Sequence, residues 1–299
     1  MLHDRPPTPR PEPSVPPRAV VLWARADRRE ALDAAQRARD FIVARGVAVM
    51  VEQATATALG EPGLPLDEAL ATADLALVFG GDGAVVSLAR AAAPWGVPVV
   101  GVNFGTFGFL AEIEAGALRS RLGALCRGAY EVDRRLMLRA VVGGHDDLLA
   151  ANDVAVKAKD PGRILELRVK LGADLIAEFP ADGVVVATAT GSTAYNLSAG
   201  GPVLMPGVPA MVLTPICPHT LATRPLVLSA EARLTIEVVE APRTSHSALV
   251  SVDGQIHREL APGELLLVER SPTCLPLARL EHGAFFHSLR GKLGWGLPR

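Results

Sequence analysis

The sequence predicts an α/β fold followed by an all-β fold: an N-terminal open parallel α/β domain and a C-terminal β-sandwich-like domain. In the first part, short apolar runs alternate with segments of helical periodicity, as in open parallel sheets. From about Tyr130 onward, strand-like segments follow one another with hardly any helix between them, which is typical of a sandwich. The last segment, Phe285–Trp295, again has the character of a helix, and we expect it to return to the first domain.

The first domain is expected over residues 18–130, completed by the returning segment 275–299, after a disordered Pro-rich tail at 1–17. Its longer helix carries apolar residues at helical spacing from Leu32 to Ile42 and ends before Gly46, a common helix stop. The predicted strands are 18–23, 47–52, 75–79 and 97–101, and the predicted helices are 27–45 and 84–93.

The second, all-β domain is expected over residues 131–274. Asp253-Gly254 is a hairpin turn signal within it, because both residues accept the left-handed backbone that such turns need. The predicted strands are 132–142, 148–156, 164–171, 175–179, 183–188, 233–239, 248–252 and 264–269.

Composition limits the class of protein. A length of 299 residues allows one or two domains with their own cores, and 49% hydrophobic but only 4% aromatic residues predict a core of Ala, Val and Leu. The net charge of -2, without a clustered Lys/Arg stripe, argues against nucleic acid as a partner. No uninterrupted apolar stretch suits a membrane span, and the N-terminus lacks a secretory signal. We therefore expect a soluble, cytoplasmic protein without a membrane partner.

The cysteines and histidines show no metal-ligand spacing. Cys126, Cys217 and Cys274 are odd in number and widely separated, so we expect buried free thiols rather than disulfides or a zinc site. The seven histidines follow no ligand pattern, and His219 is expected to be structural. We predict no metal site built from protein ligands alone.

The turn Gly80–Gly83 (GGDG) directly follows the predicted strand 75–79 and precedes a helix. Ligands of open α/β sheets bind beyond the carboxyl ends of strands, and glycines at a helix start let a phosphate approach backbone N–H groups. The carboxylate of Asp82 would repel a phosphate there unless it holds Mg²⁺ or takes a proton. The turn therefore predicts a phosphate site, and the alternative is a tight strand-to-helix connection.

Two further segments leave two interpretations open. Gly101–Leu110 (GVNFGTFGFL) is a glycine-rich turn with three phenylalanines; it packs under the sheet or presents a ring to a base. Asn152-Asp153 lies in a β segment, where both residues are disfavoured. This pair forms an Asx turn or binds an adenine edge and ribose hydroxyls.

The segment Asp182–Pro202 (DGVVVATATGSTAYNLSAGGP) combines a buried strand, a Ser/Thr-rich turn and a short helix. Its backbone N–H groups, hydroxyls and the ring of Tyr195 suit a nucleoside. The alternative is a turn whose hydroxyls satisfy its own backbone.

These turns, in this order, resemble the NAD kinase family, whose members transfer a phosphoryl group to the adenosine 2′-hydroxyl of NAD and so make NADP. The resemblance extends from about Arg18 to the C-terminus. GGDG alone also occurs in lipid kinases and phosphofructokinases, whereas the turn TGSTAY with an Asn-acid pair is far more specific. The motifs that carry it are GGDGA at 80–84, GVNFGTFGFLAE at 101–112, RRLML at 134–138, Asn152-Asp153, the segment 182–202, PHTLATRPLVL at 218–228, Asp253-Gly254-Gln255 and FFHSLRGKLGW at 285–295.

The resemblance implies a role for each matching residue of the first domain. Asp82 would be the catalytic acid-base or Mg²⁺-linked group near the 2′-hydroxyl, with Gly81 and Gly83 approaching the ATP phosphates. Phe109 would lie against the adenosine. The donor would be ATP or polyphosphate, the substrate NAD, and the metal Mg²⁺ or another divalent ion.

In the second domain the resemblance implies an NAD-binding role. Family members are homo-oligomers, often tetramers, whose β domains build the NAD sites together, and Asp182 would reach the nicotinamide half from a neighbouring subunit. Asn152 and Asp153 would bind adenine and ribose hydroxyls. The residues that would line the NAD pocket are Thr190, Thr193, Ala194 and Tyr195.

Three positions depart from the family pattern. Ala84 stands where a Thr is common, so one hydroxyl near the phosphates is absent. Asp153 replaces the common Glu, which shortens the acid by about a methylene, and Ala189 replaces a Pro and adds an N–H group. Two other functions remain as alternatives: a related kinase of a lipid or sugar, and a non-catalytic NAD(P)-binding regulator.

Overall fold

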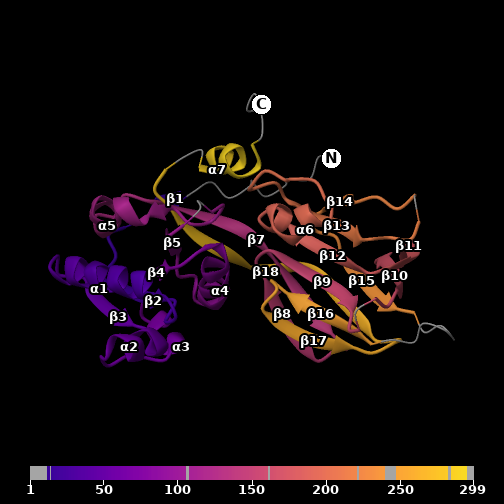
Figure 1. Cartoon of the computed structure of the whole chain (residues 1–299), viewed down its shortest axis with the longest axis horizontal. Helices are drawn as coiled ribbons and strands as arrows, with labels where there is room; N and C mark the ends of the chain where they lie inside the picture. The colour runs from indigo at the N-terminus through magenta and orange to yellow at the C-terminus, as the bar shows by residue number, and fades with distance from the viewer. Residues whose placement is uncertain are drawn as a thin grey trace, which may run out of the picture. The chain divides into compact units, whose positions relative to one another are not determined.

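The computed structural model describes residues 12–13, 15–105, 108–160, 162–220, 222–239, 247–281 and 284–294. The chain divides into two compact units, Met1–Arg134 with Leu275–Arg299, and Arg135–Cys274. Their elements are labelled in Figure 1. Each unit is described by itself.

The first unit contains an open parallel sheet, which confirms the predicted fold class. The strands lie in the order β3, β2, β4, β5, followed by the end of β18, and all neighbours run parallel. Their bounds are β2 Ala19–Ala24, β3 Ala48–Val51, β4 Leu75–Phe79, β5 Val99–Asn103 and β18 Leu265–Arg279.

Two short pairings add to this sheet. The strand β6 (Ile113–Glu114) pairs with β5, and β1 (Glu12–Pro13) pairs with β7 (Glu131–Val142) at Val132 and Glu131. The pairing of β1 differs from the disordered tail expected over 1–17, because its backbone groups have partners there. The rest of that tail up to residue 11, and residue 14, lie outside the described residues.

Six α-helices of the first unit lie within the described residues. The long helix α1 buries a face of small and branched side chains, including Ala31, Ala35, Ala38 and Ile42, which matches its predicted periodicity. The bounds are α1 Arg29–Val43, α2 Gln53–Leu59, α3 Leu66–Leu70, α4 Asp82–Ala92, α5 Leu118–Cys126 and α7 Ala284–Leu293.

The helix α4 begins at Asp82, two residues before the predicted start at residue 84. Glycine has poor helix propensity, which favoured a helix start after Gly83. In the structure Gly81 has an extended backbone and ends the turn, while Asp82 occupies the first helical turn. The acidic side chain is therefore held on the rigid helix and not on a loop.

The second unit is a sandwich of two antiparallel sheets, again as predicted. One sheet runs β11, β10, β15, β18, with β7 and β8 beside it; the other runs β14, β13, β12, β9, β16, β17. The bounds of the strands not yet given are β8 Asp146–Ala150, β9 Asp153–Ala158, β10 Leu165–Leu171, β11 Asp174–Ala181, β12 Gly183–Thr188, β13 Ala210–Ile216, β14 Leu226–Ser229, β15 Leu234–Val238, β16 Ala248–Val252 and β17 Ile256–Leu260.

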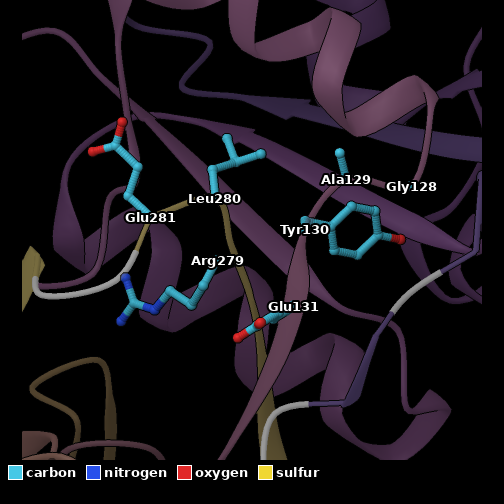
Figure 2. Close-up of a pocket in the computed structure, with 7 residues that line it drawn as sticks. All are labelled: Gly128, Ala129, Tyr130, Glu131, Arg279, Leu280 and Glu281. Carbon is cyan, nitrogen blue, oxygen red and sulfur yellow. The ribbon is translucent and has the colours of Figure 1, made fainter.

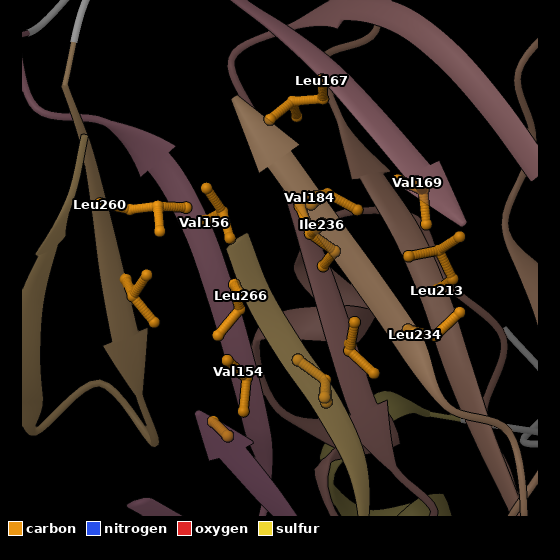
Figure 3. Packing of buried hydrophobic residues seen from close by; sticks show 14 of the residues in the cluster. Val154, Val156, Leu167, Val169, Val184, Leu213, Leu234, Ile236, Leu260 and Leu266 are labelled. Carbon is orange, nitrogen blue, oxygen red and sulfur yellow. The ribbon is translucent and has the colours of Figure 1, made fainter. Parts of the chain in front are cut away.

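The core of the second unit lies between its two sheets. Figure 3 shows Val154 and Val184 of one sheet and Leu167, Ile236 and Leu266 of the other as neighbours in this cluster. These side chains are fully buried, and the alternation of buried and half-buried residues along β10 and β15 is that of strands with one face on a core. The predicted core of aliphatic residues is confirmed.

One predicted strand of the second unit is wrong. The apolar stretch 148–156 forms two strands, β8 and β9, separated at Ala151-Asn152. The carboxylate of Asp253 accepts hydrogen bonds from the backbone N–H groups of Ala151, Asn152 and Asp153 at 2.7–3.2 Å. Because Asp253 is a hundred positions away in the chain, its effect on this break is invisible to local periodicity.

The predicted turn at Asp253-Gly254 is confirmed as the hairpin between β16 and β17. Asp253 and Gly254 have φ values of 52° and 68°, the left-handed backbone for which Asp-Gly is favoured in hairpin turns. The cysteines are free, as predicted, but the expected burial is wrong: Cys126 and Cys274 are half-buried and Cys217 is exposed. No helix within the described residues is long and apolar enough to cross a membrane.

Candidate active site

Asp82 is held by the glycine-rich segment that follows β5. Its Oδ2 accepts the backbone N–H of Phe109 at 2.8 Å, and its Oδ1 accepts those of Leu110 and Ala111 at 3.1 and 3.3 Å. Three amides therefore fix the carboxylate at the start of α4. About 30% of its side chain remains exposed, so a ligand can still reach it.

The approach of this segment to Asp82 requires a glycine at position 108. A Cβ built on Gly108 would overlap the Asp82 carboxylate, so only glycine allows the amides of Phe109 and Leu110 to reach it. The Gly108 carbonyl accepts a hydrogen bond from the Ser288 hydroxyl of α7 at 2.9 Å. The turn therefore packs between two helices of the same unit.

The backbone before and after Asp82 is open. A Cβ at Gly81 or Gly83 would meet no described atom within 4 Å, in contrast to Gly108. Such glycines leave room for a ligand to approach the backbone at the start of α4, where the helix dipole favours an anion. Gly81, Asp82, Gly83 and Phe109 are thus brought together in the first unit.

A lysine that the sequence analysis did not single out completes this group. The Lys292 ammonium of α7 lies 3.5 Å from Asp82 Oδ2 and 5.0 Å from the centroid of the Phe109 ring. The Phe109 ring in turn lies 6.0 Å from that of Phe285. Sequence periodicity did not point to Lys292, because it lies 210 positions after Asp82 and only the returning segment brings it there.

In the second unit, Asn152 and Asp153 lie at the start of β9. Asn152 is half-buried, whereas Asp153 is only 5% exposed. Burial, and then the neighbouring carboxylate of Asp253, raise the pKa of Asp153 to about 7, against a smaller opposing effect of Lys157. Its protonation therefore changes near neutral pH.

The turn after β12 packs directly on Asn152. A Cβ at Gly191 would overlap the Asn152 carbonyl, so glycine permits the close approach. The Thr188 hydroxyl donates to the Ala151 carbonyl at 2.8 Å and accepts the Gly191 N–H at 2.9 Å. These contacts bring the Asn-Asp pair and the Ser/Thr-rich turn together.

Some hydroxyls of this turn satisfy its own backbone, as the alternative interpretation expected. Ser192 donates to the Ala189 carbonyl at 2.7 Å, and buried Asn196 donates to the Ser192 and Pro202 carbonyls at 2.9 and 3.0 Å. These are different residues from those that the resemblance assigns to a ligand. Thr193, which the resemblance assigns to a ligand, also donates within the turn, to the Thr190 carbonyl at 3.4 Å.

The residues assigned to the ligand lie at the surface of this turn, with one exception. Thr193, Ala194 and Tyr195 are half-buried, whereas Thr190 is only 6% exposed. The Lys157 ammonium lies 5.2 Å from the centroid of the Tyr195 ring. Burial, followed by the neighbouring Asp153 carboxylate, raises the pKa of Tyr195. Its hydroxyl can donate a hydrogen bond.

Asp182 lies at the opposite end of β12 from this turn. Its side chain is exposed, and its Oδ1 lies 3.7 Å from His219 Nε2. The His219 backbone N–H donates to the Pro180 carbonyl at 2.9 Å. The structure therefore places Asp182 apart from Asn152 along its strand, and it gives the carboxylate a histidine neighbour that the sequence analysis considered only structural.

The first unit also contains a cavity of about 320 Å³. Figure 2 shows Arg279, Leu280 and Glu281 of the returning segment on one side of it and Tyr130 on the other. Of the described residues that line it, none is a predicted site residue. Arg279 is engaged by Glu112 at 2.7 Å, so we regard the cavity as a feature of the join between the returning segment and the sheet.

The chain is similar to known proteins in sequence and in structure. A family model described as the ATP-NAD kinase N-terminal domain matches residues 20–130, and one described as the C-terminal domain matches residues 151–280. The NAD kinase of Syntrophotalea carbinolica is 35% identical over 283 residues, covering 93% of this chain and 98% of its own length. The NAD kinase of Moorella thermoacetica is 40% identical over 265 residues, covering 87% and 84%.

Two solved structures share the fold. A crystal structure of yeast NADH kinase complexed with NADH matches 99% of this chain and 94% of its own, with a TM-score of 0.85 and 22% identity. A crystal structure of an NAD kinase from Archaeoglobus fulgidus in complex with ATP matches 91% and 98%, with a TM-score of 0.73 and 24% identity. Both likenesses concern the α/β and all-β architecture.

Proposed function

The chain belongs to the ATP-NAD kinase family, and we propose that it transfers the terminal phosphoryl group of ATP to the 2′-hydroxyl of the adenosine ribose of NAD, giving NADP. Polyphosphate is the alternative donor. The observation that carries the proposal is the carboxylate of Asp82, fixed by three amides beside open glycine backbone. It lies at the carboxyl end of β4, where parallel sheets bind their ligands.

Asp82 is the group we assign to proton transfer. A ribose hydroxyl is a poor nucleophile near neutral pH, so its proton needs an acceptor as the new P–O bond forms. We assign this acceptance to Oδ2, which accepts one amide hydrogen bond whereas Oδ1 accepts two, and which lies 3.5 Å from the Lys292 ammonium. Phosphoryl transfer depends mainly on positioning and charge neutralisation, so no covalent nucleophile is needed.

The residues present fit a divalent metal held largely by the substrate. Mg²⁺ usually keeps several waters and takes one or two carboxylates beside substrate phosphates. Asp82 offers one partly exposed carboxylate, and within the described residues no group of three or more His, Cys, Asp or Glu forms a metal cage. When bound, the ion would neutralise charge on the donor phosphates, and Asp82 would be its protein ligand.

The second unit supplies the residues we assign to NAD. Asn152 and Asp153 bind the adenine edge and the ribose hydroxyls, while Thr193, Ala194 and Tyr195 offer partly exposed polar groups and a ring beside them. The support for this assignment is the contact of the turn at Gly191 with the Asn152 backbone. We assign Thr190 to shaping this turn because it is buried, and Asp182 to the nicotinamide half.

We further propose a cytoplasmic homo-oligomer. The three free cysteines suit a reducing compartment. The edge strand β14 exposes apolar side chains, with Leu226 and Val227 both at least 40% exposed, and an apolar edge strand is a ready surface for association. The ligands we expect are nucleotides, with NAD sites completed between subunits.

The test is formation of NADP by the purified, full-length chain. We expect NADP from NAD with ATP and Mg²⁺, detected by a dehydrogenase specific for NADP, with NADH and polyphosphate as parallel substrates. Folded protein that forms no NADP from either donor would refute the proposal. In that case, phosphorylation of a sugar or lipid panel would point to a related kinase, and NAD binding without turnover would point to a regulator.

The variant Asp82→Asn belongs in the same assay. Loss of one acid-base group lowers the rate about 10²- to 10⁴-fold, and we expect a fall in kcat within that range. An amide has one acceptor oxygen where the carboxylate has two, so Asp82→Asn loses hydrogen-bond acceptors for the loop amides. The melting temperature is therefore recorded to detect any loss of stability. A folded Asp82→Asn enzyme that keeps most of its kcat would exclude Asp82 from the mechanism.

A further inference from the structure

We infer that Lys292 is a further functional residue of the site: its ammonium offsets the charge of Asp82 and contacts the terminal phosphates of the donor. The inference rests on the proposed function, because it assumes a polyphosphate-bearing donor at the turn Gly80–Gly83. It assigns to the C-terminal helix α7 a part in the chemistry and not only in the fold. All the contacts that carry it lie within the first unit.

The geometry places the ammonium at the oxygen assigned to proton transfer. Lys292 Nζ lies 3.5 Å from Asp82 Oδ2, which also accepts the Phe109 amide. It also lies over the Phe109 ring at 5.0 Å, a cation–π arrangement that orients the ammonium. About 34% of the Lys292 side chain is exposed, so the group is accessible to a ligand that reaches Asp82.

The segment that carries Lys292 is anchored on both sides of the Asp82 loop. The Glu112 carboxylate, one residue after the last amide that binds Asp82, accepts the backbone N–H groups of Leu280 and Glu281 at 3.0 Å each and pairs with Arg279. At the other end, Ser288 bonds to the Gly108 carbonyl. These contacts hold α7 against the loop, so the position of Lys292 is built into the unit.

A protein cation at this place has a chemical role beside that of the metal. Asp82 is a negative charge in a turn where a donor phosphate would bind, and its three amide partners supply dipoles but no net charge. An ammonium has three donor hydrogens, so Lys292 can keep one on Asp82 and direct others to phosphate oxygens. Exposed ion pairs stabilise a fold very little. If the pair of Lys292 and Asp82 were only structural, removing the lysine would leave donor binding unaffected.

The experiment compares ATP affinity and turnover in matched variants. Lys292→Met removes the charge and keeps much of the aliphatic length, Lys292→Arg keeps the charge, and Arg290→Met removes an exposed charge from the same helix as a control. ATP binding is measured by isothermal titration calorimetry without NAD, so that it does not depend on turnover. Melting temperatures and kcat and KM for ATP and NAD complete the comparison.

We expect Lys292→Met to weaken ATP binding about tenfold, the loss of one charged contact. The KM for NAD and the melting temperature should stay close to wild type, Lys292→Arg should recover part of the affinity, and Arg290→Met should change little. In an Asp82→Asn background, Lys292→Met should weaken ATP binding less, because the charge to be offset is gone. An ATP affinity within about twofold of wild type in both Lys292→Met and a Lys292→Gln variant would overturn the inference.

Failure of the proposed function is distinguishable from failure of this inference. If the wild-type chain makes no NADP, the kinase proposal fails, but the calorimetric comparison of ATP affinities still decides the role of Lys292. If the wild-type chain makes NADP and Lys292→Met binds ATP normally, only the inference on Lys292 fails.

Discussion

At the scale of single residues, Asp153 is a buried carboxyl group beside a second one, that of Asp253. It is only 5% exposed, and its pKa is raised to about 7 by burial and by the Asp253 carboxylate. The three backbone N–H groups near this pair all bind Asp253 and none binds the Asp153 carboxylate. The Asp253 carboxylate thus has three backbone partners, while half-buried Lys157 is the charge that opposes the rise in the pKa of Asp153.

This arrangement predicts a pH dependence of stability with a definite sign. The unfolded pKa of Asp153 is its ordinary value of 3.8, and the folded value is about 7. Between these values the folded state binds more protons, so stability falls as pH rises from about 4 to about 7. We expect Asp153→Asn to remove this penalty and to raise the melting temperature relative to wild type at pH 8 more than at pH 5.

The measurement is a thermal unfolding series from pH 5 to pH 8 for wild type and Asp153→Asn, with Asp182→Asn as the exposed control. Equal pH profiles for wild type and Asp153→Asn would show that this carboxyl does not titrate in the range. The same substitution should raise the KM for NAD at pH 8, where we assign the charged carboxylate to the ribose hydroxyls. The charged carboxylate of Asp153 therefore lowers the stability of the fold while it favours the binding of NAD.

At the scale of elements, the segment between β5 and β6 is the part of the first unit that positions Asp82. Its amides reach the carboxylate only because Gly108 has no side chain. Gly105 lies in the same segment, but a Cβ there would meet no described atom within 4 Å. The two positions therefore differ in the space that an added Cβ would find.

We predict that Gly108→Ala lowers kcat at least about tenfold, because the added methyl displaces the Asp82 carboxylate from its amides. Gly105→Ala is the matched control and should keep kcat near wild type. Activity and melting temperature of both variants, measured side by side, test the prediction. A Gly108→Ala enzyme as active as Gly105→Ala would mean that the position of Asp82 does not depend on this segment.

At the scale of the whole molecule, the exposed apolar side chains of β14 bear on assembly. The strand lies at the edge of its sheet and exposes Leu226 and Val227, and Met205, in the loop that precedes β13, is exposed as well. Lysine on an edge strand opposes edge-to-edge pairing. We therefore predict that Val227→Lys lowers the oligomer size and, if NAD sites are shared between subunits, the specific activity.

Size is measured by light scattering over a dilution series, with activity assayed at the same concentrations. Leu64→Lys, at an exposed apolar position in the first unit, is the control and should assemble like wild type. A species shown to be monomeric that keeps full activity would contradict shared sites. A Val227→Lys variant of unchanged size would place the subunit contact elsewhere.

The sequence by itself determined the fold class and the approximate place of the long elements. The apolar run of β4, the helical spacing of α1 and the turn at Asp253-Gly254 are local signals, and the structure follows them. Short elements such as α2 were not predicted because distant groups stabilise them. The hydroxyl of buried Thr55 accepts a hydrogen bond from the backbone N–H of Ala24, 31 positions earlier in the chain.

The candidate site shows the same difference between local sequence signals and contacts that form only in the folded chain. Glycine-rich turns and polar residues at strand ends are visible in the sequence and made Asp82, Asn152 and the turn ending at Tyr195 candidates, and the family resemblance added Phe109. Only the tertiary structure decided that Asp82 lies beside Lys292 and that Asp153 lies beside Asp253. Burial and proximity between residues a hundred or more positions apart set the charge balance of each group, and those quantities arise only when the chain is folded.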